Sequence, residues 1–326
     1  MKIWNIALEP IETRYTIDWN VQFPEVYKKT KNEYEMIYGE KIKSELKGKF
    51  FLDPINTNIW KLTQMTQLLK RIDEIKEDDV VFFHDLWFPS LEVLPYIKHL
   101  TEKKIKICGI LHAGTYDVND LTNQTGMTRW AKHMEEAWFD VVDKIFVATQ
   151  YHKDIIVDNR MVDPKKIIVT GLPIDFKKLK YYKSKTKEGI IFTGRKSKEK
   201  GLDTINEFSK ELDINIVIDK NYNKQQYLTA LGKSKIVFAP SEQETFGYGI
   251  VEGMAMDCIP VVPDKLSFKE TVPKRFRYST LEEAKNMIIK NKNNDENLSK
   301  YVKKYDYKNV IGKMIKEMKN IGDTND

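Results

Sequence analysis

Short apolar runs alternate with longer amphipathic segments along the first half of the chain. The apolar runs are rich in Ile, Val and Phe and predict buried strands at residues 2–8, 78–84, 104–112 and 143–149. The amphipathic segments carry Leu or Met at steps of three and four residues, which predicts helices at residues 57–75 and 125–142. Because strands and helices follow one another in turn, the pattern predicts a parallel sheet that is covered on both faces.

The second half repeats this arrangement. Strands are expected at residues 188–194, 214–219, 235–241 and 259–264. Helices are expected near residues 200–212, 223–233 and 247–257, and two more at 281–293 and 298–320. Turn residues and a run of lysines predict a boundary near residues 172–188. The sequence therefore predicts an α/β protein with two Rossmann-like domains facing a cleft, residues 1–175 and 176–326, in which the last helices close the structure.

Length and composition agree with two soluble domains. The 326 residues exceed the usual domain size of about 100–150 residues, and 41% hydrophobic with 31% charged residues excludes collagen-like and disordered classes. The two cysteines, Cys108 and Cys258, lie in apolar runs, which argues against a disulfide scaffold or a thiolate metal site and favours a reducing compartment. Since no apolar run reaches the roughly 18–20 residues of a membrane helix, we expect a cytoplasmic protein without a membrane span.

The positive charge is concentrated in the middle of the chain. Lys and Arg number 54 against 48 Asp and Glu, so the net charge of +6 is modest for this length. Between Lys177 and Lys200, however, nine lysines and Arg195 face only Glu188 and Glu199. This stretch is either a solvated linker or a surface that attracts a phosphate or a polyanion.

Polar residues follow the predicted strands of both halves. In open parallel sheets, ligands bind beyond the carboxyl ends of the strands. The residues at these ends are Glu9, Glu12, Arg14, His84, Asp85, His112 and Gly114 in the first half, and Arg195, Ser241, Glu242 and Glu244 in the second. Because both sheets carry charged or imidazole groups at this edge, one ligand is expected to touch both domains.

The segment APSEQETFGYGIVEGMAMDCIPVV, residues 239–262, is the most informative part of the chain. Gly247 and Gly249 open a helix whose first N–H groups are unpaired and whose positive dipole end accepts a phosphate. Glu244 precedes this helix and Glu252 lies on it, eight positions later. A carboxylate accepts hydrogen bonds from two neighbouring hydroxyls, which is what gripping a ribose or a hexose requires.

This segment resembles a known family signature. Two glutamates eight positions apart, with FGYG between them, EGMA following and then the strand IPVV, are similar to the signature of the retaining glycosyltransferases of the GT-B fold, the glycosyl transferases group 1. The resemblance implies that Glu252 holds the ribose hydroxyls of a nucleotide and that Glu244 contacts the donor sugar. It also implies donor binding by the intervening residues Phe246, Gly247, Tyr248 and Gly249.

A second motif supplies positive charge. The segment FTGRKSKEKGLD, residues 192–203, is similar to the GR-x4-K segment of the same family and provides Arg195 and Lys200. Cleavage of a glycosyl phosphate bond leaves a diphosphate whose negative charge needs a divalent metal or fixed cations. The sequence has no Asp-x-Asp triplet, so we expect Arg195 and Lys200 to supply the cations and expect no metal in the chemical step.

The first half matches the family less closely. His112 follows a buried strand and resembles a family histidine that contacts the donor sugar near the reacting carbon, through its ring or its carbonyl. His84 resembles a position that faces the acceptor, where His84 with Asp85 would act as a base; the alternative is simple loop capping. The family's glycine-rich loop is replaced by LEPIETRYTIDW, residues 8–19, so Glu12 or Arg14 would take over phosphate or acceptor contacts.

The resemblance implies retaining transfer of a sugar from a nucleotide-sugar donor, a UDP-hexose such as UDP-glucose, to a hydroxyl. The base is not carried over, because the short interval between residues 219 and 235 leaves no room for the usual base-binding loop. The opening ExxETRYTxxW resembles phage enzymes that glycosylate hydroxymethylated DNA bases, which implies DNA as acceptor and the host cytoplasm as location.

Several alternatives remain open at the level of the sequence. The acceptor could instead be a polysaccharide, a lipid-linked glycan, a protein or a small molecule. The protein could also be a non-catalytic binder of nucleotides or nucleic acid, or an epimerase that acts on the UDP-sugar. The pair Glu244 and Glu252 favours the transferase, since a binding module would not need acids on both the sugar and the ribose side. The oligomeric state is not predicted.

Overall fold

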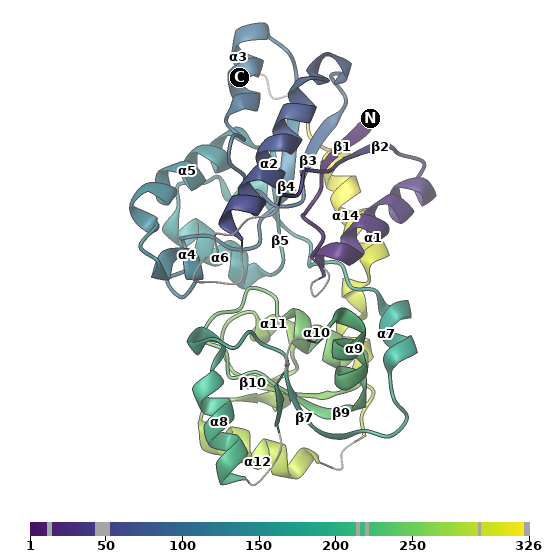
Figure 1. The fold of residues 1–326 in the computed structure, drawn as a ribbon, viewed down its shortest axis with the longest axis vertical. Coiled ribbons are helices and arrows are strands. Elements are labelled where there is room, and N and C mark those ends of the chain that lie inside the picture. The colour runs from purple at the N-terminus through teal and green to yellow at the C-terminus, as the bar shows by residue number, and fades with distance from the viewer. Residues whose placement is uncertain (12–14, 43–52, 213–215, 219–221, 293–294, 323–326) are drawn as a thin grey trace. The chain divides into compact units, whose positions relative to one another are not determined.

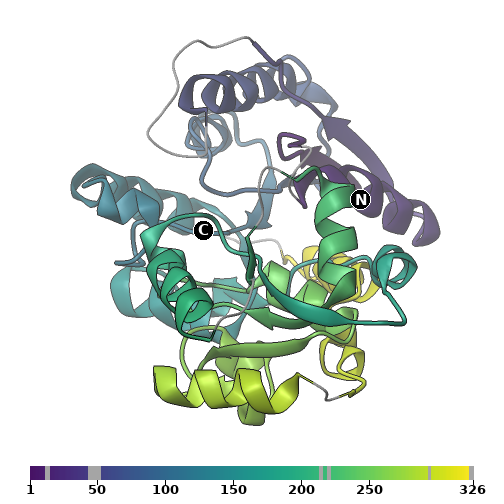
Figure 2. The same cartoon turned by 60° about the horizontal axis from the view of Figure 1, so that its bottom comes forward.

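The chain folds into two compact units, each built around a parallel sheet (Figure 1 and Figure 2). The computed structural model describes residues 1–11, 15–42, 53–212, 216–218, 222–292 and 295–322. The first unit comprises Met1–Val147, Ile155–Thr170 and Ile311–Asp326, and the second comprises Ala148–Asp154 and Gly171–Val310. The predicted α/β class is thereby confirmed.

The first unit contains a six-stranded sheet in the order β2-β1-β3-β4-β5-β6, with every neighbouring pair parallel. Its strands are β1 (Lys2–Ile6), β2 (Glu33–Ile37), β3 (Val80–Phe83), β4 (Lys106–Ile110), β5 (Lys144–Val147) and β6 (Ile167–Val169). Four of these were predicted, whereas β2 and β6 were not. The strand order changes direction beside β1, which pairs with β2 on one side and β3 on the other.

Helices connect these strands and cover both faces of the sheet. The helices that begin in this part of the chain are α1 (Thr16–Lys29), α2 (Pro54–Leu69), α3 (Val93–Thr101), α4 (Leu121–Gln124), α5 (Thr128–Val141) and α6 (Gln150–Asn159). Helix α2 begins at Pro54 because the Asp53 carboxylate accepts hydrogen bonds from the N–H groups of Ile55 and Asn56, at 3.1 and 2.9 Å. On the sheet, Phe82 packs against Phe23 of α1, with ring centroids 5.7 Å apart.

The second unit contains a five-stranded sheet in the order β11-β10-β9-β7-β8, again with parallel neighbours. Its strands are β7 (Glu188–Phe192), β8 (Ile216–Ile218), β9 (Ser234–Phe238), β10 (Ile259–Pro263) and β11 (Arg277–Tyr278). Its helices are α7 (Phe176–Tyr182), α8 (Leu202–Glu211), α9 (Lys224–Lys233), α10 (Tyr248–Ala255), α11 (Phe268–Thr271), α12 (Leu281–Asn291) and α13 (Ser299–Val302). Helices α10 and α12 lie on opposite sides of this sheet (Figure 1).

The single helix predicted at residues 298–320 is interrupted. Helix α13 ends at Val302, a 3-10 turn covers Lys303–Tyr305, and α14 runs from Tyr307 to Lys319. The backbone on either side of Asp306 pairs with Ile174 instead of continuing the helix: the Ile174 N–H donates to the Tyr305 carbonyl, and the Tyr307 N–H donates to the Ile174 carbonyl, each at 2.9 Å. The interruption therefore has a tertiary cause that helical periodicity does not show.

Helices of the described ranges are all too short or too polar to cross a lipid bilayer. Within the same ranges, no group of three or more His, Cys, Asp or Glu side chains could hold a metal ion. The two cysteines, Cys108 and Cys258, are both buried and unpaired with each other.

Candidate functional site

The candidate site of the second unit lies where the strand order changes direction. Strands β7 and β9 are neighbours in the sheet, and Phe192 is in register with Phe238. The residues that follow these two strands, including Arg195 after β7 and Ser241 after β9, therefore emerge at the same edge. In open α/β sheets, ligands bind at such a point because the connecting helices leave toward opposite faces and open a crevice.

Lys200 and Glu244 meet at this point. Lys200 is buried at the end of a 3-10 turn, Lys198–Lys200, and its Nζ donates to the backbone carbonyl of Gln243. The same Nζ lies 3.1 Å from Gln243 Oε1 and 3.1 Å from Glu244 Oε2. The other carboxylate oxygen, Glu244 Oε1, accepts the N–H of Gly247 at 3.0 Å. The Glu244 carboxylate is thus held between a buried cation and the start of α10.

The start of α10 depends on two glycines. Gly247 has φ +83°, in the left-handed region that glycine adopts without strain. Gly249 lies directly against the end of β7, where a Cβ at this position would be 2.1 Å from Thr193 Oγ1. The first turn of α10 can therefore approach the strand ends only because residue 249 has no side chain.

The side chains of Phe246 and Tyr248 pack within the second unit. Phe246 is buried, and its ring centroid lies 5.1 Å from that of Tyr248 and 5.0 Å from that of Tyr305. The Tyr248 hydroxyl donates to the Pro173 carbonyl at 3.2 Å. Because the Phe246 ring is packed inside the unit, only the backbone of Phe246 could contact a ligand.

Glu252 lies further along α10 and contacts α9. Its Oε1 is 2.9 Å from Lys224 Nζ, and its Oε2 accepts a hydrogen bond from the Tyr227 hydroxyl at 2.7 Å. Only 7% of the Glu252 surface is exposed. Neither partner was singled out from the sequence.

Arg195 is paired within its own loop. Its guanidinium NH2 group donates to Glu199 Oε1 at 3.2 Å, and Ser197 Oγ donates to the same oxygen at 2.6 Å. Burial favours the neutral form of Glu199, but these hydrogen bonds and the charges of Arg195 and Lys200 outweigh it and lower the pKa of the carboxyl. The Arg195 side chain keeps 34% of its surface exposed, so it is accessible to an anion at this edge.

Several lysines of the run from 177 to 200 make contacts within the second unit and are not available to bind an anion. Lys183 pairs with Asp257, and Lys200 is buried in the site described above. Lys187 Nζ donates to the carbonyls of Gly232 and Ser234 at 2.9 and 3.2 Å. At least these three lysines hold the second unit together, which favours a structural interpretation for part of the run.

In the first unit, His84 lies in the core and not at a ligand-facing surface. Its side chain is fully buried, with its ring centroid 4.3 Å from that of Phe23. His84 Nε2 is 3.2 Å from Asn5 Oδ1, which also accepts the Tyr27 hydroxyl at 2.6 Å. Burial, with a smaller contribution from His112, lowers the pKa of His84 to about 3. This corrects the expectation that His84 faces an acceptor as a base.

His112 is held in one orientation at the end of β4. Its Nε2 donates to the His84 carbonyl at 2.8 Å, so Nδ1 is the acceptor, and the Tyr15 hydroxyl lies 3.2 Å from it. The ring also packs beside Trp19, at a centroid distance of 5.3 Å. Burial lowers the pKa of His112, although the charge of Asp85 acts in the opposite direction. The lowered pKa favours the neutral imidazole.

Asp85 is partnered by a cation. Lys61 Nζ lies 2.8 Å from Asp85 Oδ2, and the Trp87 N–H donates to Oδ1 at 3.1 Å. Burial opposes ionisation, but the charge of Lys61, a contribution from His112 and the hydrogen bonds from Lys61 and the Trp87 N–H together outweigh it. They lower the pKa of Asp85, which makes the carboxylate a weak base. Two further residues expected at this edge, Glu12 and Arg14, lie outside the described residues.

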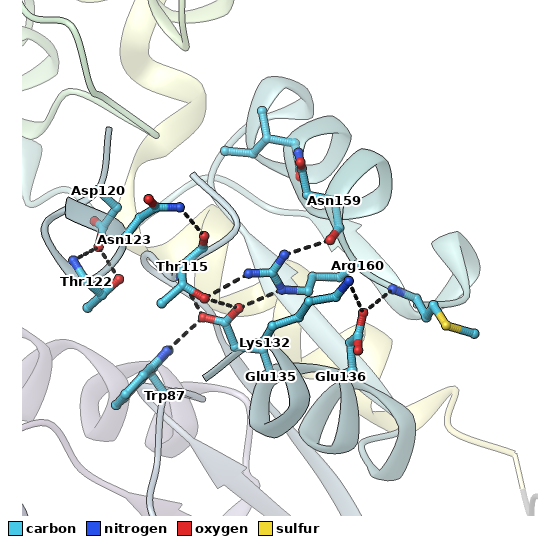
Figure 3. Close-up of polar contacts among 12 residues, drawn as sticks. Trp87, Thr115, Asp120, Thr122, Asn123, Lys132, Glu135, Glu136, Asn159 and Arg160 are labelled. Atoms are coloured by element: carbon cyan, nitrogen blue, oxygen red, sulfur yellow. Dashed lines mark hydrogen bonds and ion pairs between the residues drawn. The ribbon is translucent and has the colours of Figure 1, made fainter. Parts of the chain in front are cut away.

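A buried carboxylate that the sequence analysis missed organises the loop after β4 (Figure 3). Glu135 of α5 accepts hydrogen bonds on Oε1 from the Thr115 N–H at 2.6 Å and from Trp87 Nε1 at 3.1 Å. Its Oε2 accepts the Thr115 hydroxyl at 2.9 Å and Arg160 Nε at 2.8 Å. Arg160 also donates to Thr115 Oγ1 and to the carbonyl of Asn159. The carboxylate therefore joins the loop, α5 and the end of α6.

The pattern of α5 contained a signal for this group. Glu135 stands four positions after Ala131 and three before Trp138, both of which are buried, so the carboxylate falls on the apolar face of the helix. A charged residue on such a face requires a partner. Gly114 gives the carboxylate room, since a Cβ there would lie 2.7 Å from Glu135 Oε1. The hydrogen bonds of the Glu135 carboxylate thus fix the loop that begins at His112.

Comparisons with known proteins show the fold. No protein-family model matches the chain, and no curated protein matches its sequence. The structure resembles sucrose-phosphate synthase from Thermosynechococcus elongatus, with a TM-score of 0.69 at 11% identity, over 97% of this chain and 98% of the other. It resembles the lipopolysaccharide outer core galactosyltransferase WaaB, with a TM-score of 0.65 at 12% identity, over 97% and 99%.

A third similar structure carries ligands. It is HepE from Anabaena, solved in complex with UDP and glucose, with a TM-score of 0.62 at 10% identity, over 98% of this chain and 99% of the other. At these identities the likeness concerns the fold alone. The chain thus has the two-domain, parallel-sheet architecture of the GT-B glycosyltransferases.

Proposed function

We propose that this protein is a retaining glycosyltransferase that moves a hexosyl group from a UDP-hexose, such as UDP-glucose, to a hydroxyl acceptor. The observation that carries the proposal is the Glu244 carboxylate, held by Lys200 and the Gly247 N–H where the second sheet changes strand order. The UDP and glucose bound to HepE, which shares the fold, support the choice of donor.

Each group of the second unit has a part in donor binding under this proposal. Arg195 and the first N–H groups of α10 face the diphosphate, whose charge grows as the glycosyl bond breaks. Lys200, whose ammonium is hydrogen-bonded to Gln243 and Glu244, acts on the diphosphate through its charge. Glu244 accepts hydrogen bonds from the sugar, and Glu252 accepts them from the ribose. Since these fixed cations and dipoles act on the leaving group, the chemical step proceeds without a metal.

The transfer step needs no protein nucleophile. The bond between the anomeric carbon and the phosphate oxygen breaks, and the acceptor oxygen bonds to the same carbon on the same face. The acceptor proton passes to the departing phosphate oxygen. His112, neutral and fixed by Tyr15 and the His84 carbonyl, contacts the sugar and does not take up this proton. Neither His84, which is buried, nor Asp85, which is paired with Lys61, is needed as a base.

We propose a hydroxymethylated pyrimidine of DNA as the acceptor, on the strength of the opening segment of the chain. A polysaccharide, a lipid-linked glycan, a protein or a small molecule would use the same donor site. The acceptor is therefore tested apart from the transfer reaction, through its dependence on salt.

The donor chemistry is tested by measuring UDP release from UDP-glucose and other UDP-hexoses, with and without acceptor. Arg195→Ala and Glu244→Ala should each lower kcat/KM about 10²–10³-fold, as for other groups that stabilise a transition state. Lys196→Ala and Glu242→Ala are matched controls from the same two loops, and we expect them to retain activity. Full turnover in either site variant would overturn the site assignment. A wild-type protein that binds nucleotide sugars but never releases UDP would be a non-catalytic binder.

A further inference from the structure

The Glu252 carboxylate is held by two side chains of a neighbouring helix. Lys224 Nζ contacts Oε1 at 2.9 Å, and the Tyr227 hydroxyl contacts Oε2 at 2.7 Å, so each oxygen has one donor. The Lys224 ammonium also lies over the Tyr227 ring, 5.1 Å from its centroid. The Lys224 and Glu252 side chains keep only 11% and 9% of their surfaces exposed.

The first turn of α9 is built to present these two groups together. Lys224 and Tyr227 are three positions apart and therefore share one face of the helix. A capping box between Asn223 and Gln226 fixes this turn. A lysine in the first turn of a helix opposes the helix dipole, which disfavours positive charge there. The pairing with Glu252 offsets this unfavourable position.

A carboxylate has about four lone-pair positions, and two of those on Glu252 are occupied by Lys224 and Tyr227. The two that remain can accept a pair of adjacent hydroxyl groups. Lys224 contacts one oxygen and Tyr227 the other, so together they fix the plane of the Glu252 carboxylate.

We propose that Lys224 and Tyr227 are positioning residues that hold the Glu252 carboxylate in the orientation that reads the vicinal hydroxyls of a ribose. The inference rests on the proposed function, in which Glu252 grips the nucleotide. It goes further in assigning the selectivity for a ribonucleotide over a deoxyribonucleotide to two residues that do not themselves touch the ribose.

The test compares the binding of UDP and 2′-deoxy-UDP by titration calorimetry. The wild-type protein should bind UDP about 10- to 100-fold more tightly, as expected for a hydrogen bond to a charged acceptor. Tyr227→Phe and Lys224→Met should reduce this ratio to about threefold or less, whereas Lys224→Arg should retain most of it. Tyr181→Phe, an exposed tyrosine of α7 in the same unit, is the matched control and should leave the ratio unchanged.

The outcomes separate this inference from the proposed function. UDP binding without discrimination in the wild-type protein would overturn the ribose-reading role while leaving the donor proposal intact. An unchanged ratio in both Tyr227→Phe and Lys224→Met would overturn the positioning role. Absence of UDP binding in the wild-type protein would overturn the UDP donor itself. Since Tyr227→Phe keeps the ring and removes one hydroxyl, it keeps the test decisive where Lys224→Met fails to fold.

Discussion

Arg160 Nε lies 2.8 Å from Glu135 Oε2, and both side chains are almost completely withdrawn from solvent. Replacing Glu135 with Ala would leave the Arg160 charge and the Thr115 hydroxyl without this acceptor in a buried site. We expect the free energy of unfolding of Glu135→Ala to fall by about 3–5 kcal/mol, the usual effect of removing one member of a buried ion pair. Chemical denaturation monitored by circular dichroism measures this loss.

The control for Glu135 is the next residue of the same helix. Glu136 forms a longer ion pair with Lys132, at 4.0 Å, in which the lysine side chain keeps 48% of its surface exposed, and it also accepts the Met161 N–H at 3.3 Å. Glu136→Ala should therefore cost less than about 1 kcal/mol. Equal losses for the two variants would show that the buried pair contributes nothing specific to the first unit.

Gly249→Ala should disturb the start of α10. The added Cβ would lie 2.1 Å from Thr193 Oγ1 and 2.5 Å from Thr193 Cβ, so either the helix or the strand end must move. We expect a loss of about 1–3 kcal/mol of stability, typical of overpacking, together with weaker UDP binding. Thermal denaturation with and without UDP measures both effects.

Gly312→Ala is the matched control, and it should change the stability in the opposite direction. Gly312 lies inside α14, and a Cβ there would meet no atom within 4 Å. The change should stabilise the protein by about 0.5–1 kcal/mol through helix propensity. If Gly249→Ala caused no loss of stability either, the close approach of α10 to Thr193 would not constrain residue 249.

The buried His84 should make stability depend on pH. Its pKa in the folded protein is about 3, below the value of 6.5 for an unperturbed histidine, so the unfolded chain binds more protons between these values. The stabilising effect of neutral His84 is present above pH 6.5 and is lost as the pH falls. At pH 5 the loss should be about 2 kcal/mol relative to pH 7.5.

Urea denaturation at pH 7.5 and pH 5 checks this prediction. In His84→Gln, whose amide can replace the hydrogen bond to Asn5, the difference between the two pH values should shrink. It should not vanish, because burial also lowers the pKa of His112. An equal pH dependence in the variant and the wild-type protein would contradict the assignment to His84.

Transfer to DNA should weaken steeply as salt increases. Contacts with DNA phosphates release counterions, so the affinity falls by orders of magnitude between about 50 and 200 mM salt when six or more phosphates are neutralised. We expect KM for a hydroxymethylated DNA duplex to rise accordingly, while the rate of UDP-glucose hydrolysis without acceptor changes far less. A flat response of KM would exclude DNA as the acceptor and favour a small or neutral one.

The local sequence carries most of the fold. Runs of Ile, Val and Phe identified the central strands, because buried parallel strands are apolar on both faces. The edge strand β2, with the sequence EYEMI, carries two glutamates and escaped detection, and β6 has only three residues. The break at Asp306 depends on pairing with Ile174, which is 132 positions earlier in the chain and leaves no local pattern.

Candidate site residues could be proposed from the sequence only where one segment supplies several of them. Glu244, Gly247 and Glu252 belong to a single loop and helix, so their spacing was informative. The partners Lys224 and Tyr227 lie 28 and 25 positions from Glu252, on another helix, and no periodicity connects them. His84 was misplaced because its burial depends on the packing of α1, including Phe23, over the end of β3.

The assignment of Ile311–Asp326 to the first unit has a practical consequence for expressing the halves separately. A polypeptide that stops near residue 175 would lack this segment. It would lose the hydrogen bond from Lys313 to the Val169 carbonyl and the ion pair between Glu317 and Lys144. No single proteolytic cut can then liberate either half intact. Isolating the first half would require covalently rejoining its distant segments, or supplying the missing tail as a separate peptide.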